Sequence, residues 1–145
     1  MRAQTLSDLA VSKTTVAKKN VFIDLDASFR RNPFTSDIYT KKDIEAVKAS
    51  IVNIILTGNF ERPFQPTFGG NINRYLFENL DDNIIDTMTS VITNIVDLYE
   101  PRAKVIGVYV AEDDIENNRL SITIQFRMIS TNQVADVTTV LQRVR

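Results

Sequence analysis

Residues 120–128 read LSITIQFRM, and this stretch decides the fold class. Apolar and polar residues alternate strictly along it, so the two sets of side chains point to opposite faces of a strand. The apolar set consists of Leu120, Ile122, Ile124, Phe126 and Met128. One apolar and one polar face are typical of an antiparallel sheet that covers a core on one side and meets water on the other. The stretch therefore predicts a strand of such a sheet.

The same period of two continues on both sides of this strand. Residues 103–111 place Ile106, Val108 and Val110 on one face, and the polar residues 112–118 then predict a hairpin loop. Residues 134–142 alternate more weakly and are the candidate for a third strand. The C-terminal part of the chain thus predicts an antiparallel sheet of two to three strands.

Upstream of residue 101 the spacing of apolar residues changes to three and four, which is typical of amphipathic helices. In residues 82–99 it involves Ile84, Ile85, Met88, Val91, Ile92, Ile95, Val96 and Tyr99. Asp81 and Asp82 favour the start of this helix, and Pro101 favours its end. Residues 41–57 predict another helix, with Thr40 as N-cap, Asp43 as its capping-box partner and a stop at 58–59. The predicted fold class is α+β: two main helices followed by a small antiparallel sheet.

The N-terminal segments carry weaker signals. Residues 1–20 contain four cations and one anion among small polar residues and predict a flexible arm, whereas residues 21–145 predict a single domain. Residues 21–26 suit a short extended piece, and a short helix is expected around 72–79. Residues 59–71 form a loop, and we expect its three phenylalanines to pack onto the domain: Phe60, Phe64 and Phe68.

Composition excludes several classes of function. The 145 residues include 17 Lys+Arg and 18 Asp+Glu, so the net charge of −1 argues against a nucleic-acid partner. The absence of Cys and His excludes thiol nucleophiles, Ser-His machinery and the common zinc sites, and we expect no metal or cofactor. The longest uncharged run, residues 49–60, is shorter than the ~20 residues needed to span a bilayer, so no membrane partner is expected.

Two small sets of charged residues are candidates for chemistry or recognition. Glu100, Pro101 and Arg102 lie between the long helix and the first long strand, where they form either an ion-pair clamp or unconnected solvated charges. Asp24 and Asp26 share one face of an extended segment and resemble half of a divalent-cation site. No further ligand cluster accompanies them, which favours a structural role.

Five segments of the chain, in order, resemble the signatures of one phage protein family. They are residues 24–29 (DLDASF), 61–69 (ERPFQPTFG), 76–81 (LFENLD), 99–102 (YEPR) and 120–124 (LSITI). The corresponding family motifs are DLDLSF, ERPFQPEFG, LFEPLD and WEPR or YEPR, followed by the next strand. The chain thus resembles the baseplate wedge and sheath-initiator subunits of contractile-tailed phages, which are related to a baseplate subunit of type VI secretion systems.

The resemblance implies a structural protein of the virion, located in the tail baseplate and assembled in the host cytoplasm. The implied partners are other baseplate wedge proteins and the tail sheath protein. Glu100, Pro101, Arg102 and Arg62 are the residues expected to contact the wedge core. The sheath is expected to add a strand to the sheet edge at Val137, Thr138, Thr139, Val140 and Leu141. Arg143 and Arg145 would blunt that edge before assembly.

Some members of this family carry a lysozyme-like label, so a peptidoglycan hydrolase is the alternative. Such an enzyme needs two carboxylates across a sugar cleft, and Glu100 with either Glu61 or Glu78 could supply them. The chain has no Trp to form a sugar platform, and Arg102 close to Glu100 would lower its pKa, which is unsuitable for a general acid. We therefore expect no enzymatic activity.

Overall fold

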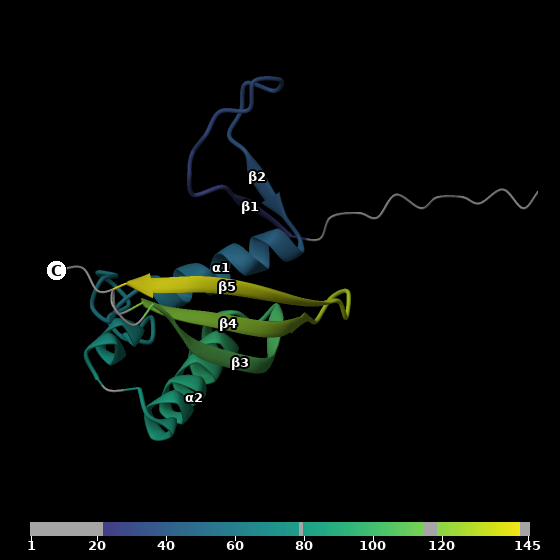
Figure 1. Cartoon of the computed structure of the whole chain (residues 1–145). Coiled ribbons are helices and arrows are strands. Elements are labelled where there is room, and N and C mark those ends of the chain that lie inside the picture. The colour runs from purple at the N-terminus through teal and green to yellow at the C-terminus, as the bar shows by residue number, and fades with distance from the viewer. Residues whose placement is uncertain (1–21, 79, 115–118, 143–145) are drawn as a thin grey trace, which may run out of the picture.

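The computed structural model describes residues 22–78, 80–114 and 119–142. The predictions for residues 1–20, for Arg143 and Arg145 and for the middle of the 112–118 loop lie outside these ranges. The elements in chain order are β1 (Ile23–Leu25), β2 (Thr40–Lys42), α1 (Ile44–Leu56), the 3-10 helix η2 (Ile72–Phe77), α2 (Asp82–Tyr99), β3 (Ala103–Asp114), β4 (Arg119–Met128) and β5 (Val134–Gln142) (Figure 1).

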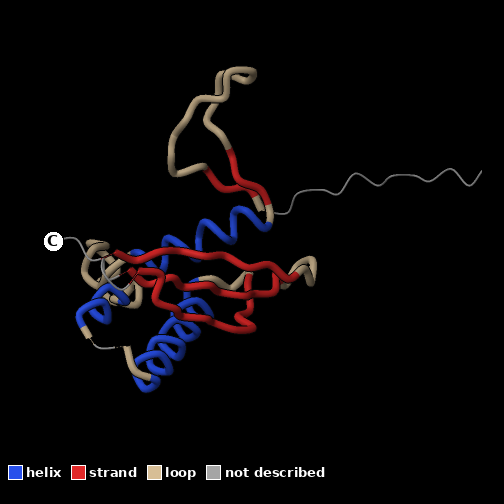
Figure 2. Tube along the Cα trace, viewed as in Figure 1, coloured by secondary structure: helices blue, strands red, loops and turns tan. Residues whose placement is uncertain are grey.

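The elements form a two-layer body with a projecting hairpin. β3, β4 and β5 make an antiparallel sheet in that spatial order, with α2 packed against β3 and α1 against β5. β1 and β2 pair antiparallel at the base of a hairpin, residues 22–43, that extends away from the body (Figures 1 and 2). We call this segment the N-terminal hairpin. Most of its length is loop and turn (Figure 2).

The prediction of two main helices followed by a single small sheet is wrong. A second sheet, β1–β2, precedes α1, and η2 lies between the two main helices. The predicted helix start was misplaced because Thr40 belongs to β2 and pairs with Leu25. Asp43 is the actual N-cap residue of α1, with a left-handed φ of 46°, and its Oδ1 accepts a hydrogen bond from the backbone N–H of Phe22 at 3.2 Å. That bond closes the base of the N-terminal hairpin.

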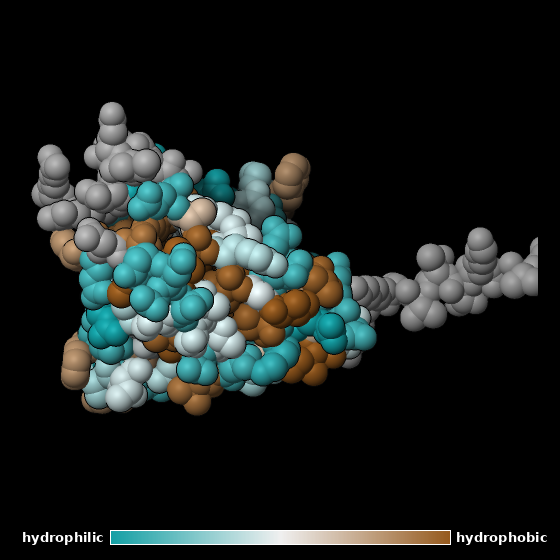
Figure 3. All heavy atoms as spheres, turned by 60° about the horizontal axis from the view of Figure 1, so that its bottom comes forward, coloured by the Kyte–Doolittle hydropathy of each residue, from teal (hydrophilic) through white to brown (hydrophobic). Residues whose placement is uncertain are grey.

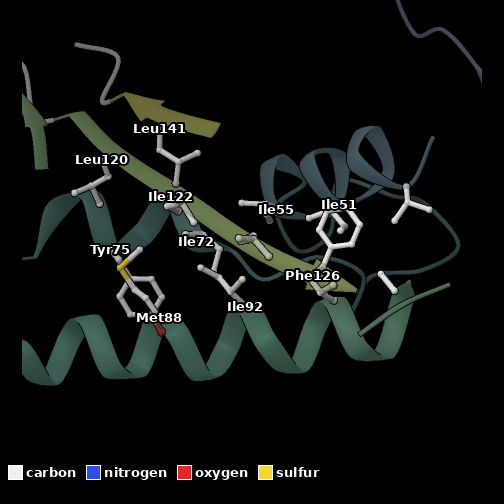
Figure 4. Close-up of a cluster of buried hydrophobic side chains, with 14 of the residues drawn as sticks. Ile51, Ile55, Ile72, Tyr75, Met88, Ile92, Leu120, Ile122, Phe126 and Leu141 are labelled. Atoms are coloured by element: carbon white, nitrogen blue, oxygen red, sulfur yellow. The ribbon is translucent and has the colours of Figure 1, made fainter. Parts of the chain in front are cut away.

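The core lies between the two helices and the inner face of the sheet (Figure 4). The predicted alternation along β4 is confirmed, since all five of its apolar side chains are buried. They meet residues of α1 and α2, and the central members of this set are Ile51, Ile55, Met88, Ile92, Val96, Ile122, Ile124 and Phe126. Full burial of each such side chain contributes roughly 1.5–3 kcal/mol, which makes this layer the main source of stability.

β3 departs from the predicted alternation at one position. Val105 pairs with Phe126 and Gly107 pairs with Gln125, so Ile106 is an extra residue between two consecutive partners. Such a β-bulge reverses the faces upstream of it. Val105 therefore packs against the core, and Ile106, which the sequence placed on the core face, is 46% exposed.

The predicted helix over residues 82–99 is confirmed as α2. Asp81 is its N-cap, and the Asp81 Oδ1 accepts a hydrogen bond from the backbone N–H of Ile84 at 2.8 Å. On the side of the molecule that carries α2, apolar surface lies in separate groups between hydrophilic side chains (Figure 3). Across the described residues, we find no helix with the length and apolar character that crossing a membrane would require.

Candidate functional site

Glu100 and Arg102 form a bidentate ion pair at the corner between α2 and β3. Glu100 caps the C-terminus of α2, and only 2% of it is exposed. The Arg102 Nε donates to Glu100 Oε1 at 2.6 Å, and the Arg102 Nη2 donates to Oε2 at 2.7 Å. Pro101 keeps the turn between them rigid. The two charges therefore form an ion-pair clamp. The alternative interpretation of the sequence, two unconnected solvated charges, does not hold.

Arg102 also connects the body to the N-terminal hairpin. Its Nη1 donates to Asp24 Oδ2 at 3.1 Å, across 78 positions of sequence. The Arg102 guanidinium carbon lies 5.3 Å from the centroid of the Phe22 ring, a distance that suits a cation–π contact. One guanidinium thus serves two carboxylates, one from the corner and one from β1. We call Asp24, Glu100 and Arg102 the corner triad.

The electrostatics of the corner triad keep Glu100 and Arg102 ionised. Burial alone would raise the pKa of Glu100, but hydrogen bonds from Arg102 and Ser50 and the charge of Arg102 hold this pKa below its ordinary value. The hydrogen bond to Glu100 raises the pKa of Arg102, with a further contribution from Asp24. A buried carboxylate that stays charged at neutral pH is unsuited to act as a general acid, because a general acid must hold a proton there.

Asp24 and Asp26 do not act as a pair. Asp26 Oδ2 accepts a hydrogen bond from the Ser28 hydroxyl at 2.6 Å, and its Oδ1 lies 3.4 Å from Lys41 Nζ. The bonds from Ser28 lower the pKa of Asp26. Asp24 and Asp26 therefore pair with different cations, Arg102 and Lys41, which is the structural role that the sequence favoured.

Arg62 lines the same cavity, of about 260 Å³, as Asp24 of the corner triad. Its guanidinium carbon stacks 3.6 Å above the centroid of the Phe68 ring, and that ring contacts Tyr99 with centroids 4.6 Å apart. The Tyr99 hydroxyl donates to the Thr67 carbonyl at 2.9 Å. Asp24, Arg62, Phe68 and Tyr99 all line the cavity. The loop that carries Arg62 is thus fastened to the end of α2 through aromatic contacts.

The phenylalanines of this loop were only partly predicted. Phe68 is 7% exposed and packs as expected, but Phe60 is 82% exposed and Phe64 is 98% exposed. The expectation that all three bury is wrong, because one ring suffices to fasten the loop to Tyr99. Two large apolar side chains therefore remain on the surface next to Arg62 in sequence.

The predicted strand-accepting residues lie on β5, at an edge of the three-stranded sheet. Along β5 the exposed and partly buried residues alternate: Thr138 and Val140 are exposed, Val137 and Thr139 are half-buried, and Leu141 is buried. β5 pairs with β4 from Val134 to Gln142 with no shift of register. Among the described strands, none pairs with the other side of β5.

Hydrogen-bond parity identifies which backbone groups of β5 face this free side. The backbone N–H of Met128 donates to the Gln133 carbonyl at 2.9 Å, so these opposed residues are a hydrogen-bonded pair. Hydrogen-bonded and non-hydrogen-bonded pairs alternate along an antiparallel ladder. The N–H groups of Val137 and Thr139 therefore point toward β4, whereas those of Thr138 and Val140 point toward the free side.

Sequence reasoning missed several members of the site. Asp24 was considered only beside Asp26, and Phe68 and Tyr99 were considered as core residues. No local spacing links residue 24 to residue 102, because the contact depends on how the N-terminal hairpin folds back onto the corner. The only available signal was that both residues lie in segments that resemble motifs of the same family.

Comparisons with known proteins agree on the family. The profile of the family described as "Baseplate wedge protein gp25" matches residues 41–133. The baseplate wedge protein gp25 of Enterobacteria phage T4 is 31% identical over 90 residues, which cover 62% of this chain and 67% of the T4 protein.

Two solved structures share the fold. A Geobacter sulfurreducens crystal structure named "putative tail lysozyme" has a TM-score of 0.63 and 25% identity, over 70% of this chain and 91% of that chain. A subunit in the cryo-EM structure of the anti-feeding prophage baseplate has a TM-score of 0.59 and 21% identity, over 82% of this chain and 83% of that chain.

The family match covers most of the described body, from β2 to the turn before β5. The YEPR corner and the β4 strand that suggested the resemblance both lie within it. The chain belongs to the gp25 family of baseplate wedge proteins, which are structural components of contractile-tail baseplates.

Proposed function

We propose that this chain joins the wedge core of its baseplate to the first ring of the tail sheath, and that a sheath subunit adds a β-strand to β5. The observation that carries the proposal is the unpaired side of β5, a nine-residue strand. A free edge offers a row of N–H and C=O groups to an incoming strand, and main-chain hydrogen bonds then supply affinity.

Of the two outer strands of the sheet, β5 suits strand addition better than β3. The β3–β4 pairing shifts register twice, between Val105 and Gly107 and between Glu112 and Asp114. Bulges increase the local twist and interrupt the regular spacing that a further strand would need. The β4–β5 pairing has no such shift, so the backbone groups of β5 keep a regular spacing on the free side.

The second part of the proposal places the wedge core at the corner triad and Arg62. Glu100 and Arg102 are bonded to each other through two hydrogen bonds, so they hold the corner in shape. Pro101 and Arg62 are exposed and are available for contact. No ion pair to Arg62 is found among the described residues, and its stacking on Phe68 fixes the guanidinium in place for a partner's carboxylate.

Hydrolysis of peptidoglycan gains little support from the geometry. Glu100 is 2% exposed, and its pKa is lowered, whereas a general acid needs an accessible carboxyl with a raised pKa. The name "putative tail lysozyme" belongs to the Geobacter protein and does not by itself assign hydrolysis to this chain. If purified chain cleared peptidoglycan and Glu100→Gln abolished the activity, the structural role would be overturned.

Proline substitutions on β5 test the strand addition. Thr138→Pro and Val140→Pro each remove an N–H group that points to the free side, and should leave the β4–β5 ladder intact. Baseplates that contain either variant should assemble and should carry no sheath in electron micrographs. Full-length sheath on baseplates with folded Thr138→Pro protein would contradict the proposal.

Thr139→Pro is the matched control, because it removes a donor to β4 and so attacks the fold itself. We expect it to lower the thermal midpoint more than Thr138→Pro does. Pull-down of other wedge proteins by the Thr138→Pro variant shows whether its wedge contacts are intact.

A further inference from the structure

A recess lies on the inner-face side of the β5 edge, next to α1. The recess has a volume of about 280 Å³. Three segments line it. The N-terminal hairpin contributes Ala27 and Lys41, and β5 contributes Val137. The α1 residues of the lining are Glu45, Lys48, Ala49, Val52 and Asn53. Figure 1 shows the same order in space, with the hairpin and β5 on opposite sides of α1.

The register of β5 determines which residue of an added strand meets this recess. Val137 turns its N–H toward β4, so on the free side it forms a non-hydrogen-bonded position. Side chains at such positions in antiparallel strands lie close together, about 4.5–5.5 Å between Cβ atoms. The side chain of Val137 lies on the inner face of the sheet and packs against the core. The residue opposite Val137 would therefore direct its side chain to the same face, next to α1.

The lining indicates what kind of side chain fits. Ala27, Ala49, Val52 and Val137 supply apolar walls. The charged groups of the rim already have partners, since Lys48 lies 3.5 Å from Glu45 and Lys41 lies 3.4 Å from Asp26. An ionised side chain would therefore lose hydration without gaining an unpaired counter-ion, whereas an apolar one would bury its surface.

We infer that this recess is a specificity pocket that takes one apolar side chain, the one opposite Val137, from the strand that adds to β5. The inference rests on the proposed strand addition and extends it, because it assigns a residue type and a register to the incoming segment. Backbone hydrogen bonds alone leave the register of a strand weakly specified, and a pocket for one side chain fixes it.

Disulfide trapping of designed strand peptides tests the pocket. The chain contains no Cys, so Thr138→Cys introduces a single thiol on the exposed face of β5. The probes are nine-residue peptides of alternating Thr and Val with one Cys and a neighbouring variable residue, which is Leu, Ala or Asp. The variable residue precedes the Cys in one set and follows it in the other. The expectation concerns the set that places the variable residue opposite Val137. At a fixed thiol–disulfide ratio, we expect the Leu peptide of that set to be trapped at least ten-fold more than its Asp peptide.

Two variants in the Thr138→Cys background fill the recess from different sides. Val52→Phe acts from α1 and Ala27→Phe from the exposed turn of the hairpin, and either should reduce the preference for Leu to within two-fold. Ser90→Phe, at an exposed position on α2 away from the recess, is the matched control and should leave the preference unchanged. The second filling variant keeps the test decisive if Val52→Phe disturbs packing.

The outcomes separate the pocket from the strand addition on which it rests. Trapping no higher than that of a scrambled Cys peptide, for every probe, would overturn strand addition at β5. Equal trapping of Leu, Ala and Asp peptides above that background would overturn the pocket and leave strand addition standing. A preference for Leu that persists in both folded filling variants would also overturn the pocket.

Discussion

Arg102 bonds to two carboxylates and lies over an aromatic ring. It is the only member of the corner triad that contacts both of the others, and it joins β1 to the end of α2. A buried ion pair adds little over an apolar replacement, but the loss of one partner leaves the other charge buried and unpaired. The contribution of Arg102 is therefore best measured by its removal.

Arg102→Ala is expected to lower the free energy of unfolding by about 3 kcal/mol, because it leaves the Glu100 carboxylate buried without its counter-ion. Arg102→Lys keeps the charge but lacks the planar fork, so an intermediate loss is expected. Urea denaturation followed by circular dichroism measures both. Equal stability of wild type and Arg102→Ala would show that the corner is ordinary surface.

Acid should weaken the fold through Glu100. Its folded-state pKa lies below the ordinary value of 4.5, so the folded state binds fewer protons than the unfolded chain in this range. The resulting stabilisation is complete above about pH 4.5 and is lost as the pH falls through the lowered folded-state value. Urea midpoints between about pH 6 and pH 3 should fall more steeply for the wild type than for Glu100→Gln. Parallel profiles would contradict the assignment.

At the residue scale, sequence reasoning identified the corner but not its third member. Glu100 and Arg102 lie two positions apart, on either side of Pro101, so an ion pair between them could be proposed from the local sequence alone. Asp24 joins them only in three dimensions. Tertiary contacts of this kind require the path of the N-terminal hairpin, and local spacing does not specify that path.

At the element scale, the loop between α1 and η2 depends on one glycine. Gly69 has a φ of +89°, and a Cβ at this position would lie 2.1 Å from the Thr57 carbonyl oxygen. The loop therefore passes the C-terminal end of α1 at a distance that no side chain permits.

Gly69→Ala is expected to lower the free energy of unfolding by about 2–4 kcal/mol, since left-handed backbone costs a non-glycine residue about 1–3 kcal/mol and the contact with the Thr57 backbone adds to it. Gly58→Ala is the matched control. Its Cβ would meet only the end of the Glu61 side chain, at 2.9 Å, which is free to move. Differential scanning calorimetry of the two variants should show a large shift for the first alone.

The elements that were predicted well are those whose periodicity is unbroken. α2 and β4 keep a single period from end to end, so every residue supports the same assignment. β3 contains a bulge, and a single inserted residue defeats any argument from alternation. β2 has three residues and adjoins a helix, so its strand character comes from pairing with β1 rather than from its own sequence.

On the scale of the whole molecule, the body and the N-terminal hairpin have different sources of stability. Every buried member of the described hydrophobic cluster lies between Val47 and Leu141, and the hairpin contributes the partly buried Phe22, which packs against the cluster. A two-stranded hairpin is marginal in water on its own, and this one is tied to the body at its base. The two main helices and the strands of the body were predictable from their periodicity, but the projecting hairpin and its two-stranded sheet were not.

Deletion of residues 1–20 should leave the thermal midpoint within about 2 °C of the full chain, because that segment lacks the apolar content to fold by itself. The same deletion should reduce incorporation into baseplates, which co-sedimentation with wedge proteins would measure. A midpoint lowered by more than about 8 °C would show that the segment belongs to the core.

The unbroken β4–β5 register has a mechanical consequence. A pull directed along β5 loads all the rungs of such a ladder together, so they must fail at once. A pull directed away from the sheet at one end loads a single rung, and the ladder peels open rung by rung. A segment seated beside β5 would share this anisotropy, provided that its own pairing is equally regular. The joint that we propose at this edge would resist tension along the strands far better than it resists peeling.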